Sequence, residues 1–197
     1  MAIVELSGLD YSQAISLAVS LGLMVRYTVI GTKFGWLGVA GSEAGLKFLT
    51  LPQPSAGAVL VVLGDSIKDA VEDACAFGDL PYRLQRYFDG EKVAFPDRLD
   101  LSSATAFQQA VWNTTRSIPY GETRSYAWVA RKIGSTRAGR AVGGALARNR
   151  LPIIVPCHRV VASGGGLGGF SGGLELKRRL LELEDGRLDT EVLTCTG

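Results

Sequence analysis

The spacing of apolar residues in the first half of the chain predicts a small α/β domain. Runs rich in β-branched and aromatic residues, separated by Gly, Ser and Pro clusters, favour β-strands. These predicted strands cover residues 24–30, 34–39, 46–51 and 58–63. Apolar residues at intervals of three and four predict helices over residues 11–20, 65–77 and 80–88. The second of these helices carries Cys75 on its apolar side, which predicts a thiol buried in the core.

The second half of the chain changes to a helical period. A helix capped by Ser103 is predicted to end at the Pro-Tyr-Gly break of residues 119–121. A second helix is predicted over residues 125–133, and a third runs from a Ser135 cap to about residue 148. Two short helices joined by a Gly-Ser turn are typical of a helix-turn-helix.

Charge divides the chain at the same place. Residues 1–103 carry 8 Lys and Arg against 12 Asp and Glu, a net charge of −4, whereas residues 104–187 carry 13 against 5, a net charge of +8. We expect an N-terminal domain over residues 1–92, a linker over residues 93–103, a C-terminal domain over residues 104–187 and a tail over residues 188–197. A basic domain tethered to an acidic one favours a polyanionic partner, although a solvated basic face would give the same count.

Composition excludes several other classes of protein. With 47% apolar and 20% charged residues the chain can bury a core, yet no apolar run of 18 residues predicts a membrane span. The first ten residues lack the basic region of a secretory signal. Three widely spaced cysteines and a single histidine predict reduced thiols, a cytoplasmic location and no metal site.

The third predicted helix of the second half has two different faces. Val142 and Leu146 lie together and are expected to face the core. The opposite face gathers cations and small residues, namely Arg137, Arg140, Ala141, Gly144 and Arg148. A glycine inside a helix costs about 1 kcal/mol relative to Ala, so two of them favour a surface that another molecule approaches closely. An ordinary amphipathic helix with exposed arginines is the alternative.

The sequence Pro-Cys-His-Arg-Val-Val at residues 156–161 concentrates the reactive side chains. An apolar run bracketed by prolines, residues 151–156, predicts a buried extended segment that ends at Cys157. His158 is the only imidazole in the chain, so no other imidazole can take the thiol proton. Residues 163–173 contain 7 glycines, whose backbone a ligand can approach closely. Together these features predict an activated cysteine nucleophile.

With RAVGGALARN before it and FSGGLELKRRLLELE after it, this motif resembles the O6-alkylguanine-DNA alkyltransferases, also called methylated-DNA–protein-cysteine methyltransferases. The resemblance runs from about Phe107 to Glu184. It implies a ribonuclease H-like α/β N-terminal domain and a mainly α C-terminal domain with a winged-helix-like helix-turn-helix.

The same resemblance implies DNA repair by direct damage reversal. The helix-turn-helix enters the minor groove of double-stranded DNA, and O6-alkylguanine or O4-alkylthymine is flipped out of the stack. The alkyl group then passes irreversibly to Cys157. Such a protein works once, needs no cofactor and is expected to be a monomer. Its expected location is the cytoplasm, beside the nucleoid in a prokaryote, or the nucleus in a eukaryote.

Roles at the reacting centre also follow from the resemblance. Cys157 is the alkyl acceptor, His158 takes its proton through a bridging water, and Glu184 orients the imidazole in the manner of a catalytic triad. Glu182 is close in sequence, but alignment without gaps favours Glu184. Asn149 matches a hinge residue between the DNA-binding helix and the active-site turn, and a plain helix cap is its alternative role.

Other positions are expected to contact DNA. Arg140 matches the finger that fills the vacated stack, and Tyr126 matches the tyrosine that crowds the 3′ phosphate and contacts the flipped base. The remaining residues expected to contact DNA or the base are Arg137, Ala138, Gly143, Gly144, Val160 and Ser171, the last two through their backbone. Gly169 and Phe170 stand where many relatives have Asn and Tyr, which leaves the tolerated alkyl size open.

Two other classes of function stay in competition. A non-catalytic alkyltransferase-like protein, which binds lesions or regulates DNA, would use the same helix-turn-helix but lack the acceptor cysteine. A Cys-His hydrolase would need an Asn or Asp partner that the sequence does not reveal, and it leaves the arginine face unexplained. The glycine loop also matches a dinucleotide fingerprint at Gly164, Gly166 and Gly169, but no βαβ pattern surrounds it.

Overall fold

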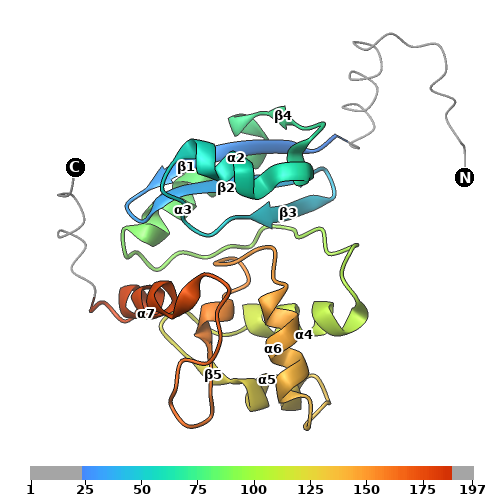
Figure 1. The fold of residues 1–197 in the computed structure, drawn as a ribbon, viewed down its shortest axis with the longest axis vertical. Helices are drawn as coiled ribbons and strands as arrows, with labels where there is room; N and C mark the ends of the chain where they lie inside the picture. Colours follow the sequence, from blue (N-terminus) through green and yellow to red (C-terminus); the bar gives the residue numbers. More distant parts are fainter. Residues whose placement is uncertain (1–23, 188–197) are drawn as a thin grey trace, which may run out of the picture.

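The computed structural model of this protein describes residues 24–187. The helix predicted over residues 11–20, and the tail with Cys195, lie outside the described residues. An N-terminal sheet domain lies against a mainly helical C-terminal domain (Figure 1), which confirms the predicted fold class. Between residues 24 and 187, no helix has the length and apolar character that a membrane crossing requires.

The N-terminal domain is built on a four-stranded sheet in the order β3-β2-β1-β4. Its strands are β1 (Arg26–Thr32), β2 (Gly35–Ser42), β3 (Gly45–Leu49) and the short β4 (Val71–Glu72). β1 and β2 form an antiparallel hairpin in register from Arg26 opposite Gly41 to Thr32 opposite Gly35. Gly35 has a φ of 119°, and a Cβ there would come within 2.5 Å of the Gln53 carbonyl oxygen. The first three predicted strands are therefore confirmed.

The fourth predicted strand, residues 58–63, is wrong. These residues belong to helix α2 (Ala56–Leu63), whose first turn is capped by the Ser55 hydroxyl, which accepts a hydrogen bond from the Ala58 N–H. Val59 and Leu63 are buried, and they pack so closely on β2 that a Cβ at Gly38 would overlap both side chains. The rest of the run faces outward, so an unbroken apolar sequence concealed a helix with one buried face.

The helix predicted over residues 65–77 is also wrong. Gly64, with a φ of 45°, ends α2, and the chain continues as two short 3₁₀ turns (Gly64–Ile67 and Ala74–Phe77) on either side of β4. Asp73 caps the second turn by accepting a hydrogen bond from the Cys75 N–H. Cys75 is consequently exposed and not a core thiol. The structure of this segment depends on the pairing of β4 with β1. That pairing joins segments far apart in the sequence, so the local spacing of apolar residues does not predict it.

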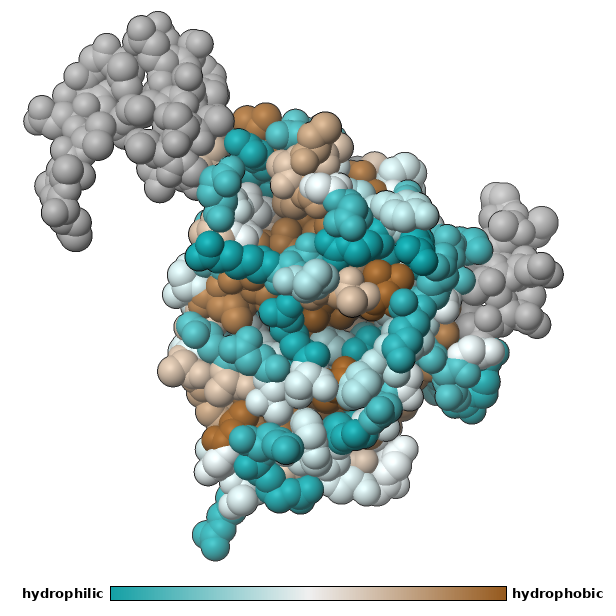
Figure 2. Space-filling model, turned by 180° about the vertical axis from the view of Figure 1, so that it is seen from behind, coloured by the Kyte–Doolittle hydropathy of each residue, from teal (hydrophilic) through white to brown (hydrophobic). Residues whose placement is uncertain are grey.

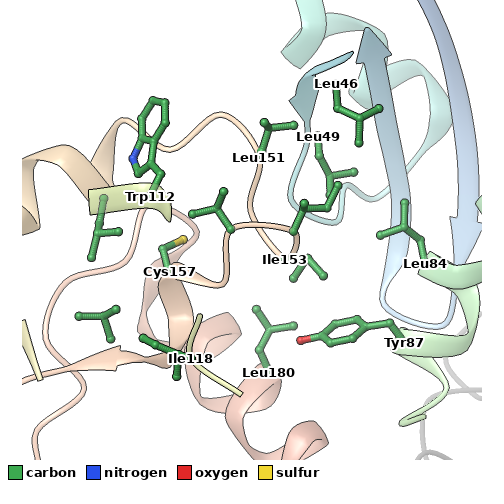
Figure 3. Packing of buried hydrophobic residues seen from close by; sticks show 14 of the residues in the cluster. Leu46, Leu49, Leu84, Tyr87, Trp112, Ile118, Leu151, Ile153, Cys157 and Leu180 are labelled. Carbon is green, nitrogen blue, oxygen red and sulfur yellow. The ribbon is translucent and has the colours of Figure 1, made fainter. Parts of the chain in front are cut away.

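Helix α3 (Leu80–Phe88) occurs where the sequence predicts it and ends at Asp89. Its buried side chains belong to a cluster that also contains residues of the C-terminal domain, so a single core spans both domains (Figure 3). Leu84 and Tyr87 on one side of this core meet Ile153 and Leu180 on the other. Residues 93–103 pass between the domains without a helix, and the domain boundaries assigned around them stay a prediction.

The C-terminal domain contains four α-helices among the described residues. They are α4 (Ala106–Arg116), α5 (Tyr126–Lys132), α6 (Gly139–Ala147) and α7 (Gly173–Glu184). The domain also contains a two-stranded parallel sheet, formed by β5 (Arg124–Ser125) and β6 (Val160–Val161). Most of the surface of this domain seen in the lower half of Figure 2 is hydrophilic or neutral.

Two helix starts differ from the prediction. Thr105 caps α4 through a reciprocal capping box with Gln108, and Ser103 lies in the preceding turn. Ser135 begins a tight turn in which it accepts a hydrogen bond from the Ala138 N–H at 2.8 Å, so α6 starts only at Gly139. Ser103 stands two residues before the cap of α4, where Thr105 takes the capping role, and Ser135 stands three residues before Ala138, the N-cap position of α6, which has no side-chain cap.

Candidate active site and nucleic-acid interface

Cys157 lies at the end of a compact turn and not of an extended segment. The Val155 N–H donates to the Leu151 carbonyl at 2.8 Å, so residues 151–155 fold back on themselves. Ile153 has a φ of 70° at this turn, a conformation that β-branched residues rarely adopt. Its side chain is only 1% exposed and packs in the core between the domains. The predicted burial is confirmed, and the predicted extended form is wrong because tertiary packing holds a locally disfavoured turn.

Asn149 links the end of α6 to the cysteine. Its Oδ1 accepts a hydrogen bond from the Leu151 N–H at 3.0 Å. Its Nδ2 donates to the Val155 carbonyl at 2.9 Å and lies 3.2 Å from the Cys157 Sγ. One amide thus contacts both ends of the turn and the sulfur atom, which is more than a plain helix cap would do.

Both members of the Cys-His pair are buried and neutral at rest. Burial raises the pKa of the Cys157 thiol, and this effect outweighs the hydrogen bond from Asn149 and the charge of Lys177, which lower it. Burial lowers the pKa of the His158 imidazole, against the hydrogen bond and charge of Glu184, which raise it. Attack by the sulfur therefore requires a proton to move from the thiol to a nearby base.

Glu184 is the carboxylate that contacts the imidazole, and Glu182 is not. The Glu184 Oε1 lies 2.7 Å from the His158 Nε2. The Glu184 Oε2 accepts hydrogen bonds from the Arg159 Nε at 2.8 Å and the Gly121 N–H at 3.1 Å. Burial alone would raise the pKa of the Glu184 carboxyl, but the hydrogen bonds from His158 and Arg159 and the charge of Arg159 lower it from 4.5 to about 2. Glu184 is thus an ionised group within the core.

This carboxylate fixes the tautomer of His158. An ionised carboxylate only accepts hydrogen bonds, so the His158 Nε2 must carry the proton. The other ring nitrogen, Nδ1, is buried and has no hydrogen-bond partner among residues 24–187. A lone pair on Nδ1 is therefore available to take a proton, as a general base for the thiol requires.

Tyr87 adds a contact that the sequence did not predict. It belongs to α3 of the N-terminal domain, and its hydroxyl donates to the Glu184 Oε1 at 2.6 Å. No motif marks it, because 97 residues separate the two partners along the chain.

Lys177 is the second residue that the sequence analysis missed. Its ammonium is buried and donates to the carbonyls of Val160 at 2.6 Å, Gly169 at 3.4 Å and Leu167. Burial lowers the pKa of Lys177 to about 8. The helical period could have revealed this residue, since Lys177 lies one turn before the buried Leu180 on the same face of α7.

Replacing Lys177 with Met is expected to loosen the glycine loop of residues 163–172. The substitution keeps the buried aliphatic stem but leaves three carbonyls without their donor, at a cost of about 2–4 kcal/mol in the free energy of unfolding. Urea denaturation and hydrogen exchange of the loop amides measure both effects. Arg178→Met on the exposed side of α7 is the matched control and should change neither. Equal stability of the two variants would contradict this account of the loop.

A cavity of about 700 Å³ opens above the sulfur. It is bordered by α5, α6 and the glycine loop, through Tyr126, Ala127, Gly139, Arg140, Gly143, Leu146, Ala147, Cys157, Ala162, Ser163, Gly169, Phe170 and Ser171. The Tyr126 hydroxyl donates to the Gly169 carbonyl at 3.2 Å and holds the loop over the cavity. Gly168 has a φ of 69°, and a Cβ there would lie 2.7 Å from the Tyr126 ring. Phe170 and Ser171 thus border the space that faces Cys157.

The outer face of α6 agrees with its predicted pattern. Val142 and Leu146 are buried, whereas Arg137, Arg140 and Arg148 are exposed. The smaller residues of this region are half-buried, namely Ala138, Gly143 and Gly144. A Cβ added at Gly143 would make ordinary contact with the Tyr126 ring at 3.8 Å. This glycine is therefore not required for helix packing.

Four of the residues expected to contact DNA or the base do not border the cavity, namely Arg137, Ala138, Gly144 and Val160. Of these, Val160 is the one with no exposed surface. It is fully buried, it does not border the cavity, and its carbonyl accepts the hydrogen bond from Lys177. Arg159 has a structural role beside the reacting centre, because its guanidinium pairs with Glu184 and donates to the Ile118 carbonyl at 2.7 Å.

A buried thiol with its own base and carboxylate opens into a cavity beside an arginine-bearing helix-turn-helix. This combination is the one expected of a DNA-binding protein that uses a cysteine as its nucleophile. Residues 106–186 match the family model described as 6-O-methylguanine DNA methyltransferase, DNA binding domain. Residues 25–101 match the ribonuclease-like domain of the same family. The chain belongs to the 6-O-methylguanine DNA methyltransferase family.

Comparisons with individual relatives agree with this assignment. A methylated-DNA–protein-cysteine methyltransferase of Methanosarcina acetivorans is 40% identical over 80% of this chain and 97% of its own. A protein of the same name from Mycobacterium tuberculosis H37Rv is 40% identical over 86% of this chain and 98% of its own. The crystal structure of Mycobacterium tuberculosis OGT in complex with DNA superposes with a TM-score of 0.72 at 40% identity, covering 86% of this chain and 99% of that one.

Proposed function

We propose that this protein repairs O6-alkylguanine, and also O4-alkylthymine, in double-stranded DNA by moving the alkyl group to the Cys157 Sγ. Membership of the family and the DNA complex of the M. tuberculosis relative support DNA repair by alkyl transfer. The observation that carries the proposal for this chain is the buried His158 Nδ1, which has no hydrogen-bond partner within residues 24–187, next to a buried thiol that borders an open cavity. We also propose that the protein acts as a monomer in the compartment that holds the DNA.

The proposed reaction begins with a proton transfer. The His158 Nδ1 takes the thiol proton through a bridging water, because adjacent side chains in the 3₁₀ turn Cys157–Arg159 point about 120° apart. The imidazolium that forms is stabilised by Glu184 at 2.7 Å. A thiolate in this buried position is not stabilised by solvent and therefore reacts readily with the alkyl carbon.

The transfer itself exchanges a hydrogen for an alkyl group. A carbon–sulfur bond forms on Sγ, the bond between that carbon and O6 breaks, and its electron pair stays on the guanine. The guanine then takes up one proton, so that overall the thiol hydrogen and the alkyl group change places. Because a thioether is not a leaving group under these conditions, one molecule repairs one base.

Transfer of label identifies the acceptor directly. Trypsin cuts after Arg150 and Arg159, so Cys157 lies alone in the peptide of residues 151–159, apart from Cys75 and Cys195. Incubation with a duplex that carries radiolabelled O6-methylguanine, followed by digestion, should place the label in this peptide. Tight binding of the duplex with no label in any peptide would favour the alternative, a non-catalytic lesion-binding protein.

Replacing Arg140 with Ala is expected to slow repair of duplex DNA about tenfold or more. Arg140 is exposed beside the cavity, where a side chain can fill the stack that the flipped base leaves, and unstacking costs a few kcal/mol. Reaction with free O6-methylguanine needs no flipping and should change less than about twofold. Single-turnover rates on both substrates, at saturating DNA, measure the difference.

Arg137→Ala is the control for Arg140. Arg137 is exposed before the first turn of α6 and does not border the cavity, so its loss should weaken binding as a lost phosphate contact does, with a smaller dependence on salt. Its rate at saturating duplex should stay near that of the unmodified protein. If Arg140→Ala behaves in the same way, Arg140 is a phosphate contact and not a finger.

A further inference from the structure

The hydrogen bond from Tyr87 joins the N-terminal domain to the reacting centre. Tyr87 is fully buried on α3, and its hydroxyl lies 2.6 Å from the Glu184 Oε1 and 3.3 Å from the His158 Nε2. Three aromatic rings surround it edge-on, at centroid distances of 5.1 Å for Phe88, 6.0 Å for Phe95 and 6.1 Å for Tyr120. In Figure 3 the hydroxyl points from α3 toward the C-terminal domain.

The direction of this hydrogen bond is fixed by its neighbours. Glu184 is ionised and only accepts, and the His158 Nε2 carries its own proton, so the Tyr87 hydroxyl donates to the carboxylate. Burial, with the charge and hydrogen bond of Glu184, raises the pKa of Tyr87 well above its ordinary value, so this donor keeps its proton. The Oε1 atom thus accepts from Tyr87, from His158 and from the Arg159 Nη2 at 2.9 Å.

These donors do not have equivalent effects. Arg159 holds both oxygens of the carboxylate and would keep the charge in place alone. Tyr87 approaches the one oxygen that faces the imidazole, and its own oxygen is close enough to Nε2 to limit where the ring can lie. Its hydroxyl therefore affects the angle and strength of the hydrogen bond between His158 and Glu184. This hydrogen bond determines which ring nitrogen of His158 carries the proton.

We propose that Tyr87 is a positioning residue of the alkyl-transfer reaction: its hydroxyl holds Glu184 against the His158 Nε2, so that Nδ1 remains the base for Cys157. This gives the N-terminal domain a part in the chemical step. The kinetic part of the inference rests on the proposed function, whereas the effect on the imidazole does not. A residue that only filled space between the domains would need the ring and not the hydroxyl.

Tyr87→Phe separates these two roles, because it keeps the ring and removes one oxygen. We expect the single-turnover rate of alkyl transfer to fall about tenfold, since a hydrogen bond to a charged group is lost. Tyr120→Phe is the matched control: its hydroxyl donates to the Gly90 carbonyl at 3.2 Å, it contacts the Tyr87 ring, and it does not touch Glu184 through its oxygen. This control should change the rate less than about twofold.

The second readout uses the single histidine of the chain. Protein labelled with ¹⁵N-histidine and freed of any purification tag gives one pair of imidazole nitrogen signals. The unmodified protein and Tyr120→Phe should show one tautomer, with Nε2 protonated and Nδ1 not. In Tyr87→Phe both signals should shift toward each other as the second tautomer becomes populated.

Two results would overturn the inference. One is a Tyr87→Phe variant with unchanged imidazole signals and a rate within about twofold of the unmodified protein. The other is a Tyr87→Phe variant that transfers the alkyl group more slowly and is less stable to heat, but whose imidazole signals are unchanged. That result would make Tyr87 a packing residue. If the unmodified protein transferred no alkyl group at all, the proposed function would fail, while the imidazole signals would still decide what Tyr87 does.

Discussion

Replacing Cys157 with Ser is expected to abolish alkyl transfer and to leave binding of alkylated duplex DNA intact. A thiol reaches its reactive anion by giving one proton to a buried imidazole, whereas a serine hydroxyl is far less acidic and its oxygen less nucleophilic. We expect the transfer rate to fall by at least about a thousandfold. Gel-shift titration with an O6-methylguanine duplex should give a dissociation constant within about threefold of the unmodified protein, because the surface of α6 is unchanged.

The hydrogen bond from Asn149 offers a reason why the serine variant should still fold. Its Nδ2 lies 3.2 Å from the sulfur and can donate to a hydroxyl oxygen in the same place. Cys75→Ser is the control, because Cys75 is exposed and far from the cavity in sequence and contacts. That variant should keep full transfer. Loss of transfer in Cys75→Ser, or label retained by Cys157→Ser, would show that Cys157 is not the acceptor.

The reacting centre could be predicted from sequence because its main parts lie close together along the chain. Asn149, Cys157, His158 and Arg159 fall within eleven residues, so they form one continuous motif in the sequence, even though packing in the core holds the turn at Ile153. Glu184 follows one helix later, and its assignment comes from the ungapped resemblance to the alkyltransferases and not from the apolar spacing of α7. Short-range patterns carry this kind of information well.

The parts that sequence did not predict depend on contacts between distant segments. Tyr87 reaches Glu184 across 97 residues, and nothing in the spacing of α3 distinguishes its hydroxyl from that of an ordinary core tyrosine. The left-handed Ile153 is held by packing between the two domains against its local preference. Residues 56–63 form a helix whose buried face packs on β2 at Gly38. The composition of these residues alone does not predict this contact.

The buried carboxylate of Glu184 is expected to make the protein less stable at low pH. The pKa of Glu184 lies below its ordinary value of 4.5, at about 2. The contribution of this group to the free energy of unfolding is therefore complete above about pH 4.5 and is lost as the pH falls toward 2. The difference between a pKa of 4.5 and one of about 2 for Glu184 corresponds to about 3 kcal/mol in the free energy of unfolding. The loss should be visible as a falling denaturation midpoint across this interval.

Replacing Glu184 with Gln is expected to remove that dependence together with most of the activity. Gln keeps the size of the side chain but cannot balance the buried charge of Arg159, and breaking a buried pair in this way costs about 3–5 kcal/mol. Its amide also lets His158 take the other tautomer, with the proton on Nδ1, where it cannot accept one from the thiol. We expect the transfer rate to fall at least about a hundredfold.

Glu182→Gln makes this test specific, because Glu182 lies half a turn away on the same helix and is only half-buried. It removes the same charge from the same helix end, so any effect of net charge or of the α7 dipole should appear equally in both variants. Glu182→Gln should keep its transfer rate, its ¹⁵N-imidazole signals and the acid limb of its stability curve. An equal loss of activity in both variants would mean that the charge of α7 matters and that the contact between Glu184 and His158 does not orient the base.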